Sequence, residues 1–276
     1  MTRELHERQI NRDNWTTLNW LTSIDYASQQ ANFVSRRQEG TGQWLLESAE
    51  FRRWVEGDKQ MLFCPGIPGA GKTILTSIVI DRLCAMFRND STVGIAYLYC
   101  EFKQKDQQSP KDLVASLLRQ LAEGRPCLPP NLTSLFSSHK RQNTRPSLGE
   151  LSRSLRSIAA TYSKVFIIVD ALDECQEANG CRARLLSELI SLREKCGANI
   201  FATSRFTPEI ARHFEGDMTL EIRAHDQDVR RYLDSHMAYL PSFVQRRLDM
   251  REEIKTAIVD AVDGMYVPLS SYWECR

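Results

Sequence analysis

The chain has 276 residues, of which 42% are hydrophobic and 26% charged, and its formal net charge is +1 at pH 7. This composition is ordinary for a globular protein and excludes a chain that is disordered throughout. There is no basic field to attract nucleic acid or an anionic membrane, and the apolar runs fall far short of the ~20 residues of a membrane helix, so we expect neither partner.

The first predicted unit is an N-terminal helical segment, residues 1–57. Its aromatic and aliphatic side chains recur at helical spacing between residues 15 and 55, interrupted by one turn at Gly40, Thr41 and Gly42. We interpret these side chains as core and not as a ligand-binding box. The first residues are polar, without the apolar stretch of a secretory signal, which favours a cytoplasmic location. The eight cysteines of the chain lack paired spacing and are interpreted as reduced, buried packing residues.

A glycine-rich loop follows a short apolar run at residues 61–64 and precedes apolar residues at helical spacing. It fits the pattern G-x-x-x-x-G-K-[ST], which wraps nucleotide phosphates between a strand and a helix; the alternative is a turn that binds nothing. The glycines let backbone N–H groups point inward around an anion. Lys72 can then bridge the β- and γ-phosphates, and Thr73 can offer its hydroxyl to Mg²⁺. The candidate phosphate-binding residues are Gly66, Ile67, Pro68, Gly69, Ala70, Gly71, Lys72 and Thr73.

Beyond the loop, predicted strands and helices alternate, which is typical of a mainly parallel sheet with helices on both faces. The second strand spans residues 93–100. One helix begins after Ser109 and another after Ser147, each with an acidic residue three positions on that completes a capping box. Residues 124–146 are rich in Pro, Ser, Asn and Arg, and we expect a mostly irregular segment there.

The third strand, residues 165–169, is a continuous apolar run that ends in Asp170. A carboxylate at the carboxyl end of a parallel strand lies where α/β sheets bind ligands, so Asp170 is a candidate for holding Mg²⁺ together with Thr73. Asp173 and Glu174 add two carboxylates, one of which could orient or deprotonate an attacking water. The alternative is an exposed acidic loop without a catalytic role.

The fourth strand, residues 199–203, leads to Arg205. If this strand lies between the first and the third, as in P-loop ATPases with a separate catalytic acid, the strand order is 5-1-4-3-2 and Arg205 faces the γ-phosphate. A locally paired, solvated Arg205 is the alternative. A fifth strand, residues 218–222, completes the nucleotide-binding unit, which we place at residues 58–222.

Taken together, the motifs at residues 66–73, 170–175 and 203–205 resemble the fungal branch of the NACHT ATPases, which belong to the STAND class. Residues 36–46 are also similar to the segment that precedes the phosphate loop in nephrocystin-like proteins. The resemblance implies an ATP-dependent molecular switch, in which ADP holds a closed form, ATP opens it, and slow Mg²⁺-dependent hydrolysis resets it. It implies signalling through other proteins, including self-association.

The resemblance also assigns roles to individual residues. It implies that Gly40, Thr41 and Gly42 lie near the base or the ribose, and the choice of ATP over GTP depends on the resemblance alone. The other residues carried over are Lys72 and Thr73 for the phosphates and Mg²⁺, Asp170 for Mg²⁺, Asp173 and Glu174 as the acidic extension, and Arg205 as the sensor.

Residues 223–276 are predicted to form a small helical domain whose first helix has Asp226 as its N-cap. The resemblance implies that its last helix, residues 254–262, packs over the nucleotide as a lid. Family members continue from Met265 into more helix, whereas this sequence reaches Pro268 and two serines, which do not extend a helix easily. We expect a short form or a truncated one, without the parts that sense a trigger.

Two other functions fit the same motifs. A non-hydrolysing interaction module would use bound nucleotide only for structure, and measured turnover separates it from an ATPase. A small-molecule kinase has the same phosphate loop, but the pair Asp173 and Glu174 and the long N-terminal helical segment count against it.

Overall fold

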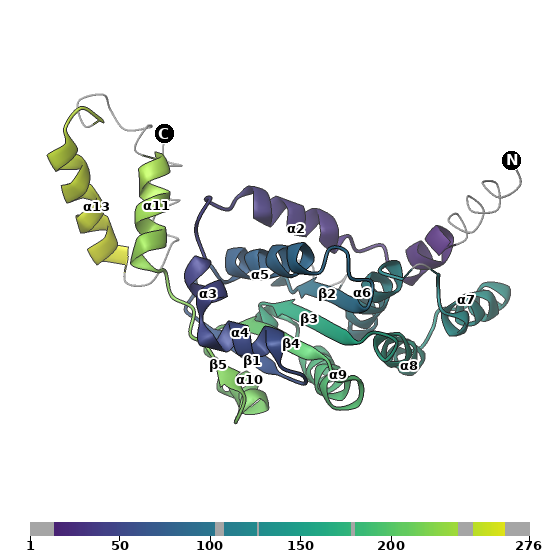
Figure 1. Ribbon diagram of the computed structural model, residues 1–276. Helices are drawn as coiled ribbons and strands as arrows, with labels where there is room; N and C mark the ends of the chain where they lie inside the picture. The colour runs from purple at the N-terminus through teal and green to yellow at the C-terminus, as the bar shows by residue number, and fades with distance from the viewer. Residues whose placement is uncertain (1–13, 103–107, 126, 178–179, 237–244, 263–276) are drawn as a thin grey trace, which may run out of the picture.

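The computed structural model describes residues 14–102, 108–125, 127–177, 180–236 and 245–262, which form a parallel sheet flanked by helices (Figure 1). The strand order is β2-β3-β4-β1-β5, and every pairing is parallel. This confirms the predicted α/β fold and the predicted order 5-1-4-3-2. The strands are β1 Met61–Pro65, β2 Val93–Tyr99, β3 Lys164–Asp170, β4 Asn199–Ser204 and β5 Met218–Thr219.

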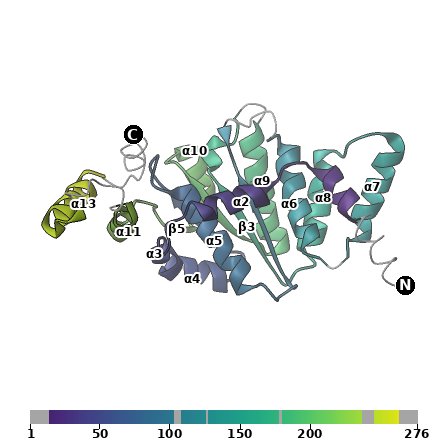
Figure 2. The ribbon, with the colours of Figure 1, turned by 90° about the horizontal axis from the view of Figure 1, so that it is seen from above.

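The central strands are buried along nearly their whole length because helices cover both faces of the sheet. Since strand-helix-strand crossovers are right-handed, α5 lies on one face and the helices that follow β2 and β3 lie on the other. The N-terminal helix α2 lies against α5, while α6, α8 and α9 pack on one another (Figure 2). These helices are α2 Tyr26–Ser35, α5 Lys72–Met86, α6 Pro110–Glu123, α8 Leu148–Ala159 and α9 Cys181–Cys196.

The N-terminal segment contains more breaks than the single turn that the sequence predicts. It forms helices at residues 14–21, α2, α3 Gln43–Glu47 and α4 Ala49–Glu56. The additional breaks occur at polar side chains that cap a following helix: Asp25 accepts a hydrogen bond from the backbone of Ser28, and Ser48 accepts one from Phe51. The core interpretation holds in part: α4 buries Trp54 against aromatic side chains of β3 and β4, but Trp15 is 59% exposed.

The expectation of an irregular segment at residues 124–146 is wrong, because α7 Pro130–Gln142 occupies most of it. The residues that suggested a loop are the ends of this helix. Pro130 stands at its start, where the missing N–H is no loss, and Asn143 ends it in the left-handed conformation with φ 53°. The ring of Phe136 packs edge-on against Trp20. Tertiary contact therefore stabilises a helix that composition obscured.

Both predicted capping boxes are present, at the starts of α6 and α8. The last strand is shorter than predicted: β5 has two residues, and Ile222 forms an isolated bridge with Gly66. Two helices follow beyond the β5 side of the sheet, α11 Asp226–His236 and α13 Leu248–Val262 (Figure 1). Asp226 is thus the first residue of α11 and not its N-cap. The short helices are η2 Leu172–Glu174, α10 Pro208–Ala211 and η4 Arg212–Phe214.

The prediction that the cysteines are buried is correct only in part. Cys64, Cys100, Cys175 and Cys181 are buried, but Cys84 and Cys127 are exposed. Among the residues that the structure describes, no helix combines the length and the apolar character that a membrane crossing requires.

Asn199 provides a test of how the sheet is joined to the N-terminal helices. Its amide donates to the carbonyl oxygens of Trp54 and Gly57, both at 2.7 Å, and its oxygen accepts from the backbone N–H of Gln60 at 3.0 Å. Asn199→Ala leaves these groups unpaired, so we expect the free energy of unfolding in urea to fall by about 3 kcal/mol. The exposed control Asn89→Ala is expected to change it by less than about 0.5 kcal/mol. Equal effects would contradict this account.

Candidate functional site

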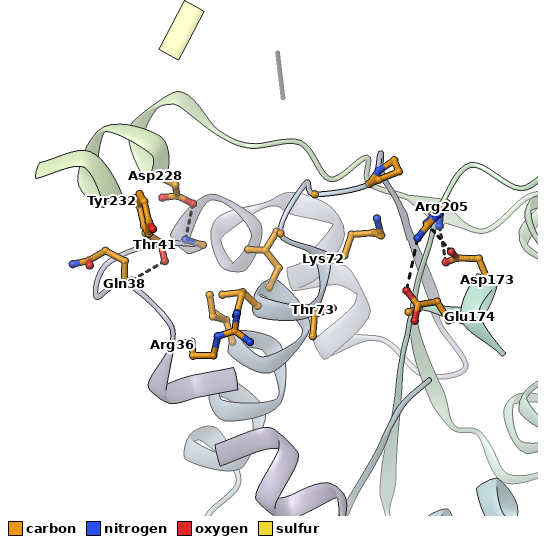
Figure 3. Close-up of a pocket in the computed structure, with 18 of the residues that line it drawn as sticks. Arg36, Gln38, Thr41, Lys72, Thr73, Asp173, Glu174, Arg205, Asp228 and Tyr232 are labelled. Atoms are coloured by element: carbon orange, nitrogen blue, oxygen red, sulfur yellow. Dashed lines mark hydrogen bonds and ion pairs between the residues drawn. The ribbon is translucent and has the colours of Figure 1, made fainter. Parts of the chain in front are cut away.

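A cavity of about 640 Å³ opens at the carboxyl ends of the strands, between the glycine-rich loop and α11 (Figure 3). Lys72 and Thr73 lie in its middle, between two ends of different character. One end holds the charged side chains of Asp173, Glu174 and Arg205. The other end is formed by residues from the N-terminal segment and from α11, namely Arg36, Gln38, Thr41, Gly42, Asp228, Tyr232 and His236.

The glycine-rich loop joins β1 to α5 as predicted. Gly69 and Gly71 have φ values of 76° and 84°, a left-handed conformation that side chains disfavour. Gly66 is required for a different reason, because a Cβ there would come within 2.4 Å of the carbonyl oxygen of Ile222. Of the eight predicted loop residues, Pro68, Gly69, Gly71, Lys72 and Thr73 line the cavity, while Gly66, Ile67 and Ala70 are not part of its lining.

Lys72 crosses the loop with its ammonium group directed at backbone oxygens. Nζ donates to the carbonyl oxygens of Gly66 and Ile67, both at 2.9 Å. Partial burial lowers the pKa of Lys72, because removing the ammonium group from water disfavours its charged form. The loop therefore already holds its cation at the cavity wall.

Asp170 lies beneath Thr73 at the end of β3 and is only 2% exposed. Three threonine hydroxyls donate to its carboxylate: Thr73 at 2.7 Å, Thr76 at 2.8 Å and Thr203 at 2.7 Å. Burial is the main influence on this carboxyl group and raises its pKa, although the hydroxyls and Lys72 oppose that effect. The structure thus brings the two predicted metal residues, Thr73 and Asp170, into direct contact.

The described residues contain no group of three or more His, Cys, Asp or Glu side chains arranged to hold a metal ion. The site still fits Mg²⁺, which is usually held by one or two carboxylates, water and substrate phosphates and not by a cage of protein ligands. Asp170 and Thr73 supply hard oxygen donors of this kind. Thr76 and Thr203 were not predicted as site residues, although Thr203 lies at a strand end, where the rule that selected Asp170 could have found it.

Arg205, Asp173 and Glu174 form one charged cluster. The backbone N–H of Arg205 donates to Asp173 at 2.8 Å, and its Nε lies 3.1 Å from the other oxygen of the same carboxylate. The guanidinium lies 3.9 Å from Glu174. Side-chain exposure is 12% for Asp173, 34% for Glu174 and 55% for Arg205. Arg205 is therefore locally paired, and it also lines the cavity.

The turn before α3 contributes Thr41 and Gly42 to the cavity, while Gly40 lies just outside its lining. Gly42 has a φ of 77°, and a Cβ there would lie 2.6 Å from Ile78 and 2.9 Å from Leu75 of α5. Its backbone N–H donates to Asp228 of α11 at 2.8 Å.

Of the two helices that follow the sheet, α11 borders the cavity, whereas no described residue of α13 lines it, which contradicts the expectation that the last helix covers it. Val229 and Leu233 of α11 form a small apolar cluster with Ile254 and Ile258 of α13, which places α13 behind α11. Nine lining residues were not predicted as site residues. Five of them have polar side chains, namely Arg36, Gln38, Asp228, Tyr232 and His236, and the others are Ile74, Leu75, Ile78 and Ala171.

A parallel sheet of this order, a glycine-rich loop ending in Lys72 and Thr73, and a buried acid on β3 together define a P-loop NTPase. Residues 40–205 match the sequence profile described as Nephrocystin 3, N-terminal. Because this range covers more than half of the chain, the chain belongs to that family, and it is a NACHT-type P-loop NTPase.

The chain is also similar to individual proteins. The chain is 25% identical over 221 residues to the vegetative incompatibility protein HET-E-1 of Podospora anserina, which covers 75% of this chain and 15% of that protein. The chain thus spans a small part of its relative. Among solved structures, a Walker-type ATPase of Pyrococcus abyssi aligns with a TM-score of 0.51 at 13% identity, over 83% of this chain and 64% of that one, which shows the fold. The ORC1 protein of Aeropyrum pernix, solved in complex with DNA, has a TM-score of 0.48 at 17% identity, over 75% and 51%.

Asp170 allows a prediction on the pH dependence of stability. Its pKa in the folded protein lies above the ordinary value of 3.8, so the folded protein retains a proton that the unfolded chain has released. The contribution of Asp170 to the free energy of unfolding therefore falls as pH rises from the unfolded-state pKa of 3.8 towards the higher pKa of the folded protein. We expect Asp170→Asn, studied without nucleotide or divalent metal, to gain stability over the wild type above pH 4 by up to about 1.4 kcal/mol per pH unit.

Urea denaturation between pH 4 and pH 8 measures this difference. The control is Asp81→Asn, which removes an exposed carboxyl group of α5 and is expected to show no such gain. An Asp170→Asn protein that is less stable than the wild type at neutral pH, or a difference that does not change with pH, would refute the account.

Proposed function

We propose that the protein is an ATP-binding switch that hydrolyses ATP slowly with Mg²⁺ and signals through other proteins. The observation that carries the proposal is that Lys72 and Thr73 line the cavity together, with Lys72 held by the loop carbonyl oxygens and Thr73 bonded to the buried Asp170. This is the arrangement that holds a polyphosphate beside a divalent cation. The preference for ATP follows from the family resemblance.

The two ends of the cavity suit the two ends of a nucleotide. The glycine-rich loop and the start of α5 favour negative charge, so the phosphates would lie there beside Lys72. The Mg²⁺ would be held near Thr73 and Asp170, where it would neutralise phosphate charge. The opposite end, with Gln38, Thr41 and Tyr232, would receive the ribose and the base, as we expected for the turn at residues 40–42.

The two acids after β3 are suited to different tasks. Asp173 is nearly buried and holds both the backbone and the side chain of Arg205, which makes it a positioning group. Glu174 is more exposed and lies farther from the guanidinium, so it is the better candidate to orient or deprotonate water. Arg205 would then register the charge of the γ-phosphate.

The proposed cellular role is based on the family resemblance and on the composition of the chain. We propose three functional units, residues 1–57, 58–222 and 223–276, acting in the cytoplasm on protein partners that include further copies of the chain. A net charge of +1 supplies no general attraction to nucleic acid or to anionic membranes.

The first test is Lys72→Ala. Loss of the ammonium group removes a charged contact to the phosphates, so we expect ATP affinity by isothermal titration calorimetry to fall by at least about 100-fold. The control is Lys111→Ala, an exposed lysine of α6, for which affinity is expected to remain unchanged. Unaltered binding by a folded Lys72→Ala protein would refute the proposed site.

The second test separates a switch that hydrolyses ATP from a non-hydrolysing module. With Glu174→Gln we expect single-turnover hydrolysis to slow by about 100-fold or more while ATP affinity stays within about threefold. Chromatography of the bound nucleotide should then recover ATP from the variant and ADP from the wild type. The control is Glu215→Gln, an exposed glutamate outside the cavity. Absence of turnover in the wild type would favour the nucleotide-stabilised module.

A further inference from the structure

One face of α11 is attached to the turn that precedes α3. Asp228 accepts the hydrogen bond from the Gly42 backbone N–H at 2.8 Å, and the Arg231 guanidinium donates to the carbonyl oxygen of Gly40. Just before α11, the ring of His225 stacks on Trp44 with ring centroids 5.9 Å apart. We call the contacts of Asp228 and Arg231 with Gly40 and Gly42 the α11 clasp.

The clasp centres on the buried backbone N–H of Gly42. Gly42 is buried and stands in a left-handed conformation at the start of α3, where no side chain caps the helix. The atoms of α5 fill the space beside it, and the acceptor comes from a residue 186 positions away. A buried N–H of this kind costs stability unless it is paired, so the turn depends on α11 for its satisfaction.

Asp228 is itself unusual for an acidic residue of a helix, since it is only 4% exposed. Burial of a carboxylate is unfavourable unless hydrogen bonds stabilise the charge. Asp226 and Asp228 both lie in the first turn of α11, where acids interact favourably with the helix dipole. Asp226 is exposed, however, and of the two we find only Asp228 bonded to the turn. The dipole therefore accounts for an acid in this turn but not for its burial against Gly42.

We propose that Asp228 is a positioning residue that makes nucleotide affinity depend on the attachment of α11 to the N-terminal turn. This inference rests on the proposed function, and it concerns a residue outside the matched range 40–205. The clasp joins the two walls of the cavity end that we propose for the ribose and the base. The turn before α3 supplies Thr41, and α11 supplies Tyr232 one helical turn after Asp228 (Figure 3). Release of the clasp would separate these walls, and affinity falls in proportion to the fraction of molecules that keep them together.

A bound nucleotide must by reciprocity strengthen the clasp. The same contact would thus transmit the state of the cavity to the pair α11 and α13, which share an apolar cluster. Asp228 acts in this scheme through the backbone of Gly42 and needs no contact with the nucleotide.

The experiment compares Asp228→Leu, Asp228→Asn and Asp226→Leu. Leucine cannot accept the Gly42 hydrogen bond, whereas asparagine keeps a neutral acceptor, and Asp226→Leu removes the same charge from the same helical turn without touching the clasp. We expect Asp228→Leu to weaken binding of ATP and ADP by about tenfold or more, Asp228→Asn to weaken it less, and Asp226→Leu to leave it within about twofold.

Hydrogen exchange distinguishes a positioning role from a merely structural one, because only a positioning role makes the protection of α11 depend on nucleotide. In the wild type, adding nucleotide should slow amide exchange both at residues 40–46 and across α11. In Asp228→Leu the nucleotide should still protect residues 66–73 but no longer α11, and the Gly42 amide should exchange faster in nucleotide-free protein. Melting temperature identifies any variant that fails to fold, in which case Asp228→Asn against Asp226→Asn decides the question.

Equal affinity and equal protection of α11 in Asp228→Leu and Asp226→Leu would overturn the inference while leaving the proposed function intact. If the wild type bound no nucleotide, the proposed function would fail. Exchange of the Gly42 amide in nucleotide-free protein would still show whether Asp228 holds the turn, and an exchange rate equal to that of the wild type in Asp228→Leu would overturn that part as well.

Discussion

The carboxylate of Asp170 holds the site together. It is buried at the end of β3, and the three hydroxyls that donate to it come from two other elements, Thr73 and Thr76 from α5 and Thr203 from β4. One acidic group therefore sets the distance between the glycine-rich loop and the centre of the sheet. Thr203 also accepts the backbone N–H of Ala171, which has a positive φ of 54° and starts the turn toward Asp173 and Glu174.

Burial of the Asp170 carboxylate lowers the stability of the fold but places a hard oxygen donor at the proposed metal site. A buried carboxylate is unfavourable in its charged form, and its raised pKa expresses that strain. A divalent cation or a set of hydroxyl donors relieves it, and both belong to the proposed nucleotide site. Lys72 shows the opposite case, since burial lowers the pKa of its ammonium group while loop carbonyls hold it in place. In the proposed site, Lys72 would receive phosphate charge and Asp170 would receive metal charge.

One end of the cavity is formed by parts of the chain that lie outside the phosphate loop. Residues of the N-terminal segment and of α11 meet there, linked by the bond between Gly42 and Asp228. Because α11 packs on α13 through a small apolar cluster, a change at the cavity can reach the C-terminal helices without a change in the sheet. In the proposed switch this is the physical connection between nucleotide and partner.

The sequence by itself determined the features whose signals are local. Continuous apolar runs marked the central strands, Ser109 and Ser147 marked helix starts, and the spacing from Gly66 to Thr73 identified the phosphate loop, because these patterns reflect backbone geometry over a few residues. It failed at α7, whose prolines and asparagine proved to be helix ends, and it placed the last helix over the cavity, which α11 borders instead. Only the tertiary structure decided which distant groups share a hydrogen bond: Thr203 with Asp170, Arg205 with Asp173, and Asp228 with Gly42. Such bonds depend on the path of the chain through space, and no short stretch of sequence records that path.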